Sequence, residues 1–139
     1  MKDIAYVSSN FSKTSDTTLA DVTGLSFTLA SGGVYKFLAK LYLSCGASGG
    51  AKVALAGTAT ATTINYIIRL NTTTALASEV NSAMGGDYGT TAAHVYAEVD
   101  GAIVVNAGGT LLIQFAQNAS NGTPSIILVG STFEVQKIG

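Results

Sequence analysis

Short stretches of alternating apolar and polar residues, cut by glycine-rich turns, recur along most of this chain. The clearest is 35–43, where an apolar residue occupies every second position from Tyr35 to Leu43. Successive side chains of a β-strand point to opposite faces, so this spacing predicts a strand with one buried face. The same alternation recurs at 64–70 and at 95–99. Because a period of two excludes an amphipathic helix, these stretches limit the chain to sheet folds.

The pattern as a whole predicts an all-β protein, an antiparallel β-sandwich with jelly-roll topology as one common solution. The strongest hairpin signal is Asp100-Gly101, which lies between two strand-like runs. Residues 73–84 differ, because their large apolar residues recur every four positions. That spacing fits one short helix, and an extended loop at the edge of the sandwich fits equally well.

The chain divides on composition into an N-terminal arm, residues 1–17, and a sandwich domain, residues 18–139. The arm is rich in Ser, Thr, Asp and Lys, with Ile4, Tyr6 and Phe11 as its large apolar residues. Ile4 and Tyr6 alternate, which allows a short strand. A chain of 139 residues has the size of one ordinary domain.

Charged residues make up only 11% of the chain, and the formal net charge is −1. The basic residues are scattered, so nucleic-acid binding is not expected. No apolar run approaches the roughly 20 residues that cross a bilayer, and no apolar signal segment follows the N-terminus, so we expect no membrane partner and assembly in a cytoplasm. A surface made mainly of Ser, Thr, Asn and Gly suits a protein that packs against neighbours.

The sequence offers no set of residues typical of catalysis, metal binding or cofactor binding. His94 is the single histidine and Cys45 the single cysteine, which provides neither a nucleophile–base pair nor a zinc site. We expect His94 at the surface or at an interface, and Cys45 as a buried or half-buried structural thiol. Glycosidase-type hydrolysis needs two facing carboxylates, and only Glu98 and Asp100 are close in sequence. The other candidate carboxylates are Glu79 and Glu134. We therefore expect a protein without enzymatic activity.

Tyrosines are the best candidates for a partner interface, because aromatic residues are enriched where proteins meet. Tyr42 and Tyr96 alternate with core positions and share their faces with Lys40 and Glu98, so we expect them at the surface. Tyr88 lies in a Gly-rich segment and is expected at a loop tip. The predicted interface consists of Ile4, Tyr6, Phe11, Tyr42, Tyr88 and Tyr96.

Two segments resemble small β-sandwich proteins of tailed-bacteriophage particles. The first is GLSFTLASGGVYKFLAKLYLS, residues 24–44, and the second is GTLLIQFAQNASNGTPSIILVGSTFEVQKI, residues 109–138. The second segment carries the resemblance best, with an apolar strand, an Asn- and Ser-rich turn, and two further strands separated by Gly-Ser.

The resemblance implies a jelly-roll or tumour-necrosis-factor-like sandwich that forms homotrimers. It implies a capsid decoration (cement) protein of the virion, which binds the major capsid protein on the outside of a phage head after assembly in the host cytoplasm and stabilises the shell. The arm, residues 1–17, would then lie on the shell or on a neighbouring subunit. An alternative is the receptor- or glycan-binding tip of a head or tail fibre.

Overall fold

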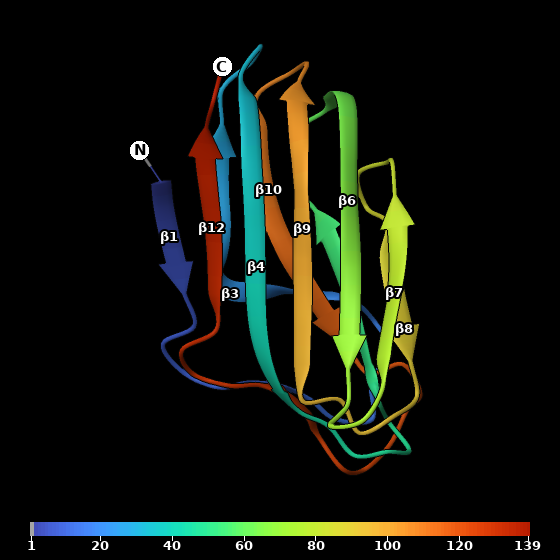
Figure 1. The fold of residues 1–139 in the computed structure, drawn as a ribbon. Coiled ribbons are helices and arrows are strands. Elements are labelled where there is room, and N and C mark those ends of the chain that lie inside the picture. The colour runs from blue at the N-terminus through green and yellow to red at the C-terminus, as the bar shows by residue number, and fades with distance from the viewer. Residues whose placement is uncertain (1) are drawn as a thin grey trace.

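The computed structural model describes residues 2–139 and folds them into two packed β-sheets (Figure 1). None of these residues is helical, so the predicted all-β class is confirmed. The strands are β1 (Lys2–Tyr6), β2 (Phe11–Lys13), β3 (Ala20–Leu29), β4 (Val34–Ser44), β5 (Ala51–Ala56), β6 (Ala61–Asn71), β7 (Leu76–Asn81), β8 (Asp87–Thr90), β9 (Tyr96–Val105), β10 (Gly109–Ala116), β11 (Ser125–Ile127) and β12 (Thr132–Lys137).

The larger sheet has the strand order β1-β12-β4-β9-β6-β7, with β11 joining β2 to β4, and the smaller sheet has the order β3-β10-β5-β8. The pairings of both sheets are antiparallel, and four of them are nested along the chain: β1 pairs with β12, β3 with β10, β4 with β9, and β5 with β8. Early strands pair with late ones and enclose the strands between them, which is the wrapping of a jelly roll. The β6–β7 hairpin is inserted between β5 and β8 and widens the larger sheet.

The core lies between the two sheets, and β4 supplies its central row. The inward residues of β4 run from Tyr35 to Leu43, and each is at most 8% exposed. Ring pairs link the sheets: Phe27 lies 5.5 Å from Phe133 between ring centroids, and Phe11 lies 6.4 Å from Phe115. The buried face predicted from the alternation at 35–43 is therefore confirmed.

Strand β3 is irregular, because two of its core residues do not alternate. Val22 and Leu25 are both buried although they are three residues apart. A bulge resolves this conflict, and Gly24 lies within it at a φ of +92°. A Cβ on Gly24 would lie 2.9 Å from the carbonyl oxygen of Tyr6, so the glycine also allows β1 to approach β3.

The hairpin predicted at Asp100-Gly101 is wrong, because both residues lie inside the continuous strand β9. Gly101 faces the core between Phe37 and Tyr66, whose rings are 6.3 Å apart. A Cβ on Gly101 would lie 2.5 Å from the Cβ of Tyr66 and 2.3 Å from the carbonyl oxygen of Asn65. The glycine is thus a site of close approach within a strand and does not mark a turn.

Residues 73–84 form neither the predicted short helix nor a plain loop, because 76–81 is strand β7, at the edge of the larger sheet. A spacing of four residues is a multiple of two, so it fits a strand face as well as a helix face. Leu76 and Val80 accordingly share the outward face of β7.

The segment predicted as an arm, residues 1–17, contributes two strands to the larger sheet from Lys2 onward. Strand β1 pairs with β12, and β2 pairs with β11. Figure 1 shows β1 at the edge of the sheet, on the opposite side from β7. In this structure the arm is therefore the edge of the sandwich, and its attachment to a shell remains a prediction.

Replacing Gly101 by alanine is expected to destabilise the fold by about 1–3 kcal/mol, because the added methyl group overpacks the contact with β6. Urea unfolding of the variant measures this loss. Gly122→Ala is the matched control, since no atom lies within 4 Å of a Cβ at that position. Equal midpoints for the two variants would contradict the close approach at Gly101.

Candidate interaction surface

The face of the larger sheet that points away from the smaller sheet, here called the outer face, collects most of the exposed large apolar side chains. One row across it runs through Tyr42 on β4, Tyr96 on β9, Asn71 on β6 and Leu76 on β7, which pair in register. Leu76 is 84% exposed and Tyr42 is 49% exposed. An exposed apolar row of this kind is typical of a surface that meets a partner.

Two further exposed residues lie on the β1 side of this row: Tyr6, in the neighbouring register row with Thr132 and Lys40, and Val129, between β11 and β12. Tyr6 is 63% exposed, and Val129 is 56% exposed. Val129 lies between β1 and β4, because the flanking N–H of Leu128 donates to the Tyr42 carbonyl and that of Gly130 donates to the Val7 carbonyl. We call the group Tyr6, Val129, Tyr42, Tyr96 and Leu76 the tyrosine band.

Two of the tyrosines form the centre of the band. The rings of Tyr42 and Tyr96 lie 5.7 Å apart at 49°, a favourable tilted arrangement for aromatic side chains. The Tyr96 hydroxyl donates to Oε2 of Glu98 at 2.8 Å. Burial, and then the neighbouring Glu98 carboxylate, raises the pKa of Tyr96, so this hydroxyl stays protonated and fixed as a donor.

One ion pair lies beside the band. Glu98 accepts from Arg69 on β6, which pairs with it across the strands. Lys40 on β4 is the strand neighbour of Glu98 on the other side, without an ion pair to it. Because Glu98 is already held by Arg69 and Tyr96, covering this surface would desolvate a matched pair rather than a lone carboxylate.

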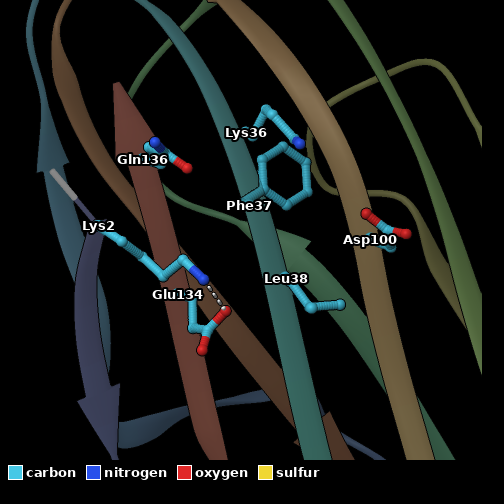
Figure 2. A pocket seen from close by; sticks show the side chains of 7 residues that line it. All are labelled: Lys2, Lys36, Phe37, Leu38, Asp100, Glu134 and Gln136. Atoms are coloured by element: carbon cyan, nitrogen blue, oxygen red, sulfur yellow. Dashed lines mark ion pairs between the residues drawn. The ribbon is translucent and has the colours of Figure 1, made fainter. Parts of the chain in front are cut away.

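A shallow hollow of about 270 Å³ opens at the other end of the outer face. Figure 2 shows Lys2 reaching Glu134 from the edge strand, at 3.5 Å between the ion-pair atoms, while Asp100 lies across the hollow on β9. Lys36 and Leu38 line it from β4. Both signs of charge are present without a cluster of either, so the hollow does not define a site for an ion.

Four of the six residues predicted for the interface lie together on the outer face: Ile4, Tyr6, Tyr42 and Tyr96. The structure places the other two elsewhere. Phe11 is half-buried against Phe115, and Tyr88 belongs to β8 and packs on the core instead of occupying a loop tip. The Gly-rich flanks of Tyr88 suggested a turn, but Tyr88 pairs with Val53 across the strands, which turns its side chain inward.

The structure adds Leu76, Val80 and Val129 to the candidate surface. Val80 is 72% exposed and lies in a row with Ile67 and Asp100. The even spacing of Leu76 and Val80 was a usable signal for a strand. Nothing in the sequence singled out Val129, because its exposure depends on the turn that joins β11 to β12.

His94 is buried at 2% exposure, so the predicted surface or interface position is wrong. Its Nε2 lies 2.7 Å from the Thr90 hydroxyl, and its Nδ1 is buried without a hydrogen-bond partner. Burial lowers the pKa of His94. Cys45 is half-buried, as expected, and burial raises the pKa of its thiol, which lowers its reactivity.

The candidate carboxylates are spread over the structure. Glu98 and Asp100 share the outer side of β9, and β4 separates them from Glu134 on β12. Glu79 lies on the opposite side of the sheet, at the position of β7 that pairs with Ile68. Within residues 2–139 no three His, Cys, Asp or Glu side chains are grouped so as to hold a metal ion. The same residues contain no helix long and apolar enough to cross a membrane.

No protein-family model matches the sequence, and no curated protein matches it. Among solved structures, the VP2 subviral particle of infectious bursal disease virus is 11% identical, with a TM-score of 0.25, over 97% of this chain and 39% of that chain. The structure of the Gx strain of that virus is 10% identical, with a TM-score of 0.24, over 97% and 38%. The chain thus spans about two fifths of those chains, and similarity at this level carries no argument about function.

Acidification is expected to destabilise the protein through His94. The folded state lowers the pKa of His94, so the unfolded chain takes up its proton at a higher pH. The contribution of His94 to the free energy of unfolding is therefore fully present above the ordinary histidine pKa of about 6.5, and it is lost as the pH drops below that value. Urea unfolding at a series of pH values measures this loss. In His94→Gln the loss between about pH 6.5 and 5 should shrink, and an unchanged loss would contradict the assignment to His94.

Proposed function

We propose that this protein is a structural component of a virus particle that packs the outer face of its larger sheet against a protein neighbour. The observation that carries the proposal is the tyrosine band, in which Tyr6 is 63% exposed and Tyr42 is 49% exposed beside Leu76. Aromatic residues are enriched and charged residues depleted at the centres of protein interfaces. The band has this composition, in a chain with few charges to oppose association.

The electrostatics of the outer face support burial against a partner. Glu98 is paired with Arg69, and Glu134 is paired with Lys2. A neighbour that covers these two pairs desolvates compensated charges, which limits the cost at those positions. Lys36, Lys40 and Asp100 lie on the same face without an ion pair to another described residue, so the neighbour must pair with them or leave them in water. A sheet face also provides a rigid platform, because the strands beneath hold their positions before and after binding.

The more specific role rests on the resemblance to tailed-phage virion proteins. It supports a capsid decoration (cement) protein that binds the major capsid protein as a homotrimer on the outside of a phage head and stabilises the shell. Within this proposal β1 keeps the role expected for the arm, since it carries Ile4 and Tyr6, both more than half exposed, at the edge of the outer face. It acts there as part of the sheet and not as a free tail.

A second candidate function uses the same surface. The paired rings of Tyr42 and Tyr96 lie next to Glu98 and Arg69, so an aromatic platform adjoins fixed donors and acceptors. A site of this kind can stack on the apolar face of a sugar while polar groups bind its hydroxyls. This favours a receptor- or glycan-binding tip of a head or tail fibre as the alternative.

A lysine placed in the band distinguishes these functions. Tyr42→Lys should lower binding to shells of the major capsid protein encoded by the same phage at least tenfold, because interface hot spots are commonly buried tyrosines worth about 2 kcal/mol or more. Binding is measured by co-sedimentation. The thermal unfolding midpoint should stay within about 6 °C of the parent's, since loss of the ring pair with Tyr96 costs about 0.5–1.5 kcal/mol.

Thr28→Lys is the matched control, because Thr28 is exposed on the outward side of the smaller sheet. It should bind shells like the parent. Loss of binding for Thr28→Lys with full binding for Tyr42→Lys would contradict the proposed surface. Normal shell binding by both variants, with loss of glycan-array binding in Tyr42→Lys alone, would instead support the fibre-tip function.

A further inference from the structure

The free edge of β7 differs from the other sheet edges of this fold. The remaining edge strands carry features that discourage pairing with another chain: β1 has the exposed charges Lys2 and Asp3, β3 is bulged near Gly24, and β2 and β8 have only three and four residues. Strand β7 has six residues in continuous register, with no lysine and no proline, and Glu79 is its single charged residue. Its large side chains, Leu76 and Val80, are 84% and 72% exposed.

The hairpin geometry shows which backbone groups of β7 face this edge. The N–H of Thr72 donates to the carbonyl of Ala75 at 3.0 Å, so these residues form a hydrogen-bonded pair between β6 and β7. Hydrogen-bonded and non-bonded pairs alternate along an antiparallel ladder. Ala77, Glu79 and Asn81 therefore bond to β6. The residues whose N–H and C=O groups point away from β6 are Leu76, Ser78 and Val80.

A contact on the other side of β6 supports this assignment. The carbonyl of Asn71 accepts from the N–H of Val95, on the side of β9, at 2.8 Å. Asn71 pairs with Leu76, so the Asn71–Leu76 pair is a non-bonded one, and the backbone groups of Leu76 point outward.

We propose that β7 pairs with β7 of a second copy of this chain, antiparallel, about a two-fold axis at Ser78. In this register Ser78 faces Ser78 of the second copy, and Leu76 faces Val80 of the second copy on both sides of the axis. All three outward-facing residues of each strand then gain backbone partners. If the axis lay at residue 77 or 79 instead, one of the three outward-facing residues of each strand would have no backbone partner in the other strand.

Charge selects the same register. With the axis at Ser78, Glu79 lies opposite Ala77 of the second copy. With the axis at residue 79, the two Glu79 carboxylates would lie directly opposite one another, which destabilises a strand pair. On the outer face the Ser78-centred register brings Leu76 and Val80 together twice, and cross-strand apolar pairs are the main stabilising contacts of a sheet.

The contact is one strand wide, which places it at the small end of specific interfaces. The pairing of β7 with β7 becomes effective where two copies are already held side by side by another contact, because it is then an intramolecular association. The proposal does not rest on the proposed function: it concerns an edge strand, whereas attachment to a shell concerns the tyrosine band. The two associations also differ in symmetry, as a two-fold pair cannot by itself produce a trimer.

A cysteine at the proposed axis tests the pairing. Hydrogen-bonded antiparallel residues have Cα atoms about 5.5 Å apart, within the range of a disulfide. In a Cys45→Ser background, Ser78→Cys should give a disulfide-linked dimer on mild oxidation at protein concentrations up to about 1 mM, the weak end of specific association. Glu79→Cys in the same background is the control. It should link at least tenfold less, because Glu79 faces Ala77 in this register.

Equal or greater linkage through Glu79→Cys would overturn the register. If Ser78→Cys forms no disulfide-linked dimer, the proposal is overturned; this is also the result expected if β7 pairs head-to-tail with β1 of a neighbour. A proline gives a second, independent readout, because the N–H of Ser78 is not used by β6. Ser78→Pro should abolish the dimer in sedimentation equilibrium while keeping the parent's unfolding midpoint within about 4 °C. A dimer that persists in Ser78→Pro would contradict the strand pairing.

Discussion

The burial of alternate side chains along β4 is the constraint on which the rest of this structure depends. Strand β4 lies between β12 and β9, and its residues from Tyr35 to Leu43 fill the space between the two sheets. Because the side-chain period of a strand is two, burying this row fixes Lys36, Lys40 and Tyr42 on the opposite face. A slip of one residue would place two lysines in the core and Phe37 in water, so the outer face is specified by the same packing that stabilises the fold.

This link between the buried face and the outer face of each strand explains which residues make up the candidate surface. The neighbours of β4 keep their own alternation in register with it, and Tyr96 of β9 is thereby placed opposite Tyr42. The register between β9 and β6 puts Glu98 beside Arg69, so the Glu98 carboxylate next to the tyrosine band is held in an ion pair. Apolar and aromatic residues are thus concentrated where the larger sheet faces outward, and the carboxylate next to the two central tyrosines is paired.

The sandwich was predictable from sequence because the periodic stretches are long, as in β4 and β6. The errors came from residues whose meaning depends on distant partners. Gly101 follows an aspartate and fits a turn, yet its role is to leave room for the backbone of β6 and the Cβ of Tyr66 across the sheet. Tyr88 is flanked by glycines and fits a loop tip, yet pairing with Val53 turns it inward. The alternation at 95–99 suggested that His94 belongs to the same strand. It lies in the segment just before β9, where its ring contacts Thr90.

The candidate surface was predictable to a similar degree. Tyr42 and Tyr96 could be found from their position opposite core residues in a strand, whereas Val129 depends on a turn between two short strands. The central claim, that the outer face of the larger sheet is the surface of assembly, is tested most directly by hydroxyl-radical footprinting of the free and the shell-bound protein. Oxidation of Tyr6 and Tyr42 should fall on binding, because the neighbour covers both rings, while that of Leu112, on the outward side of the smaller sheet, stays the same. Protection of Leu112 with unchanged oxidation of both tyrosines would contradict the claim.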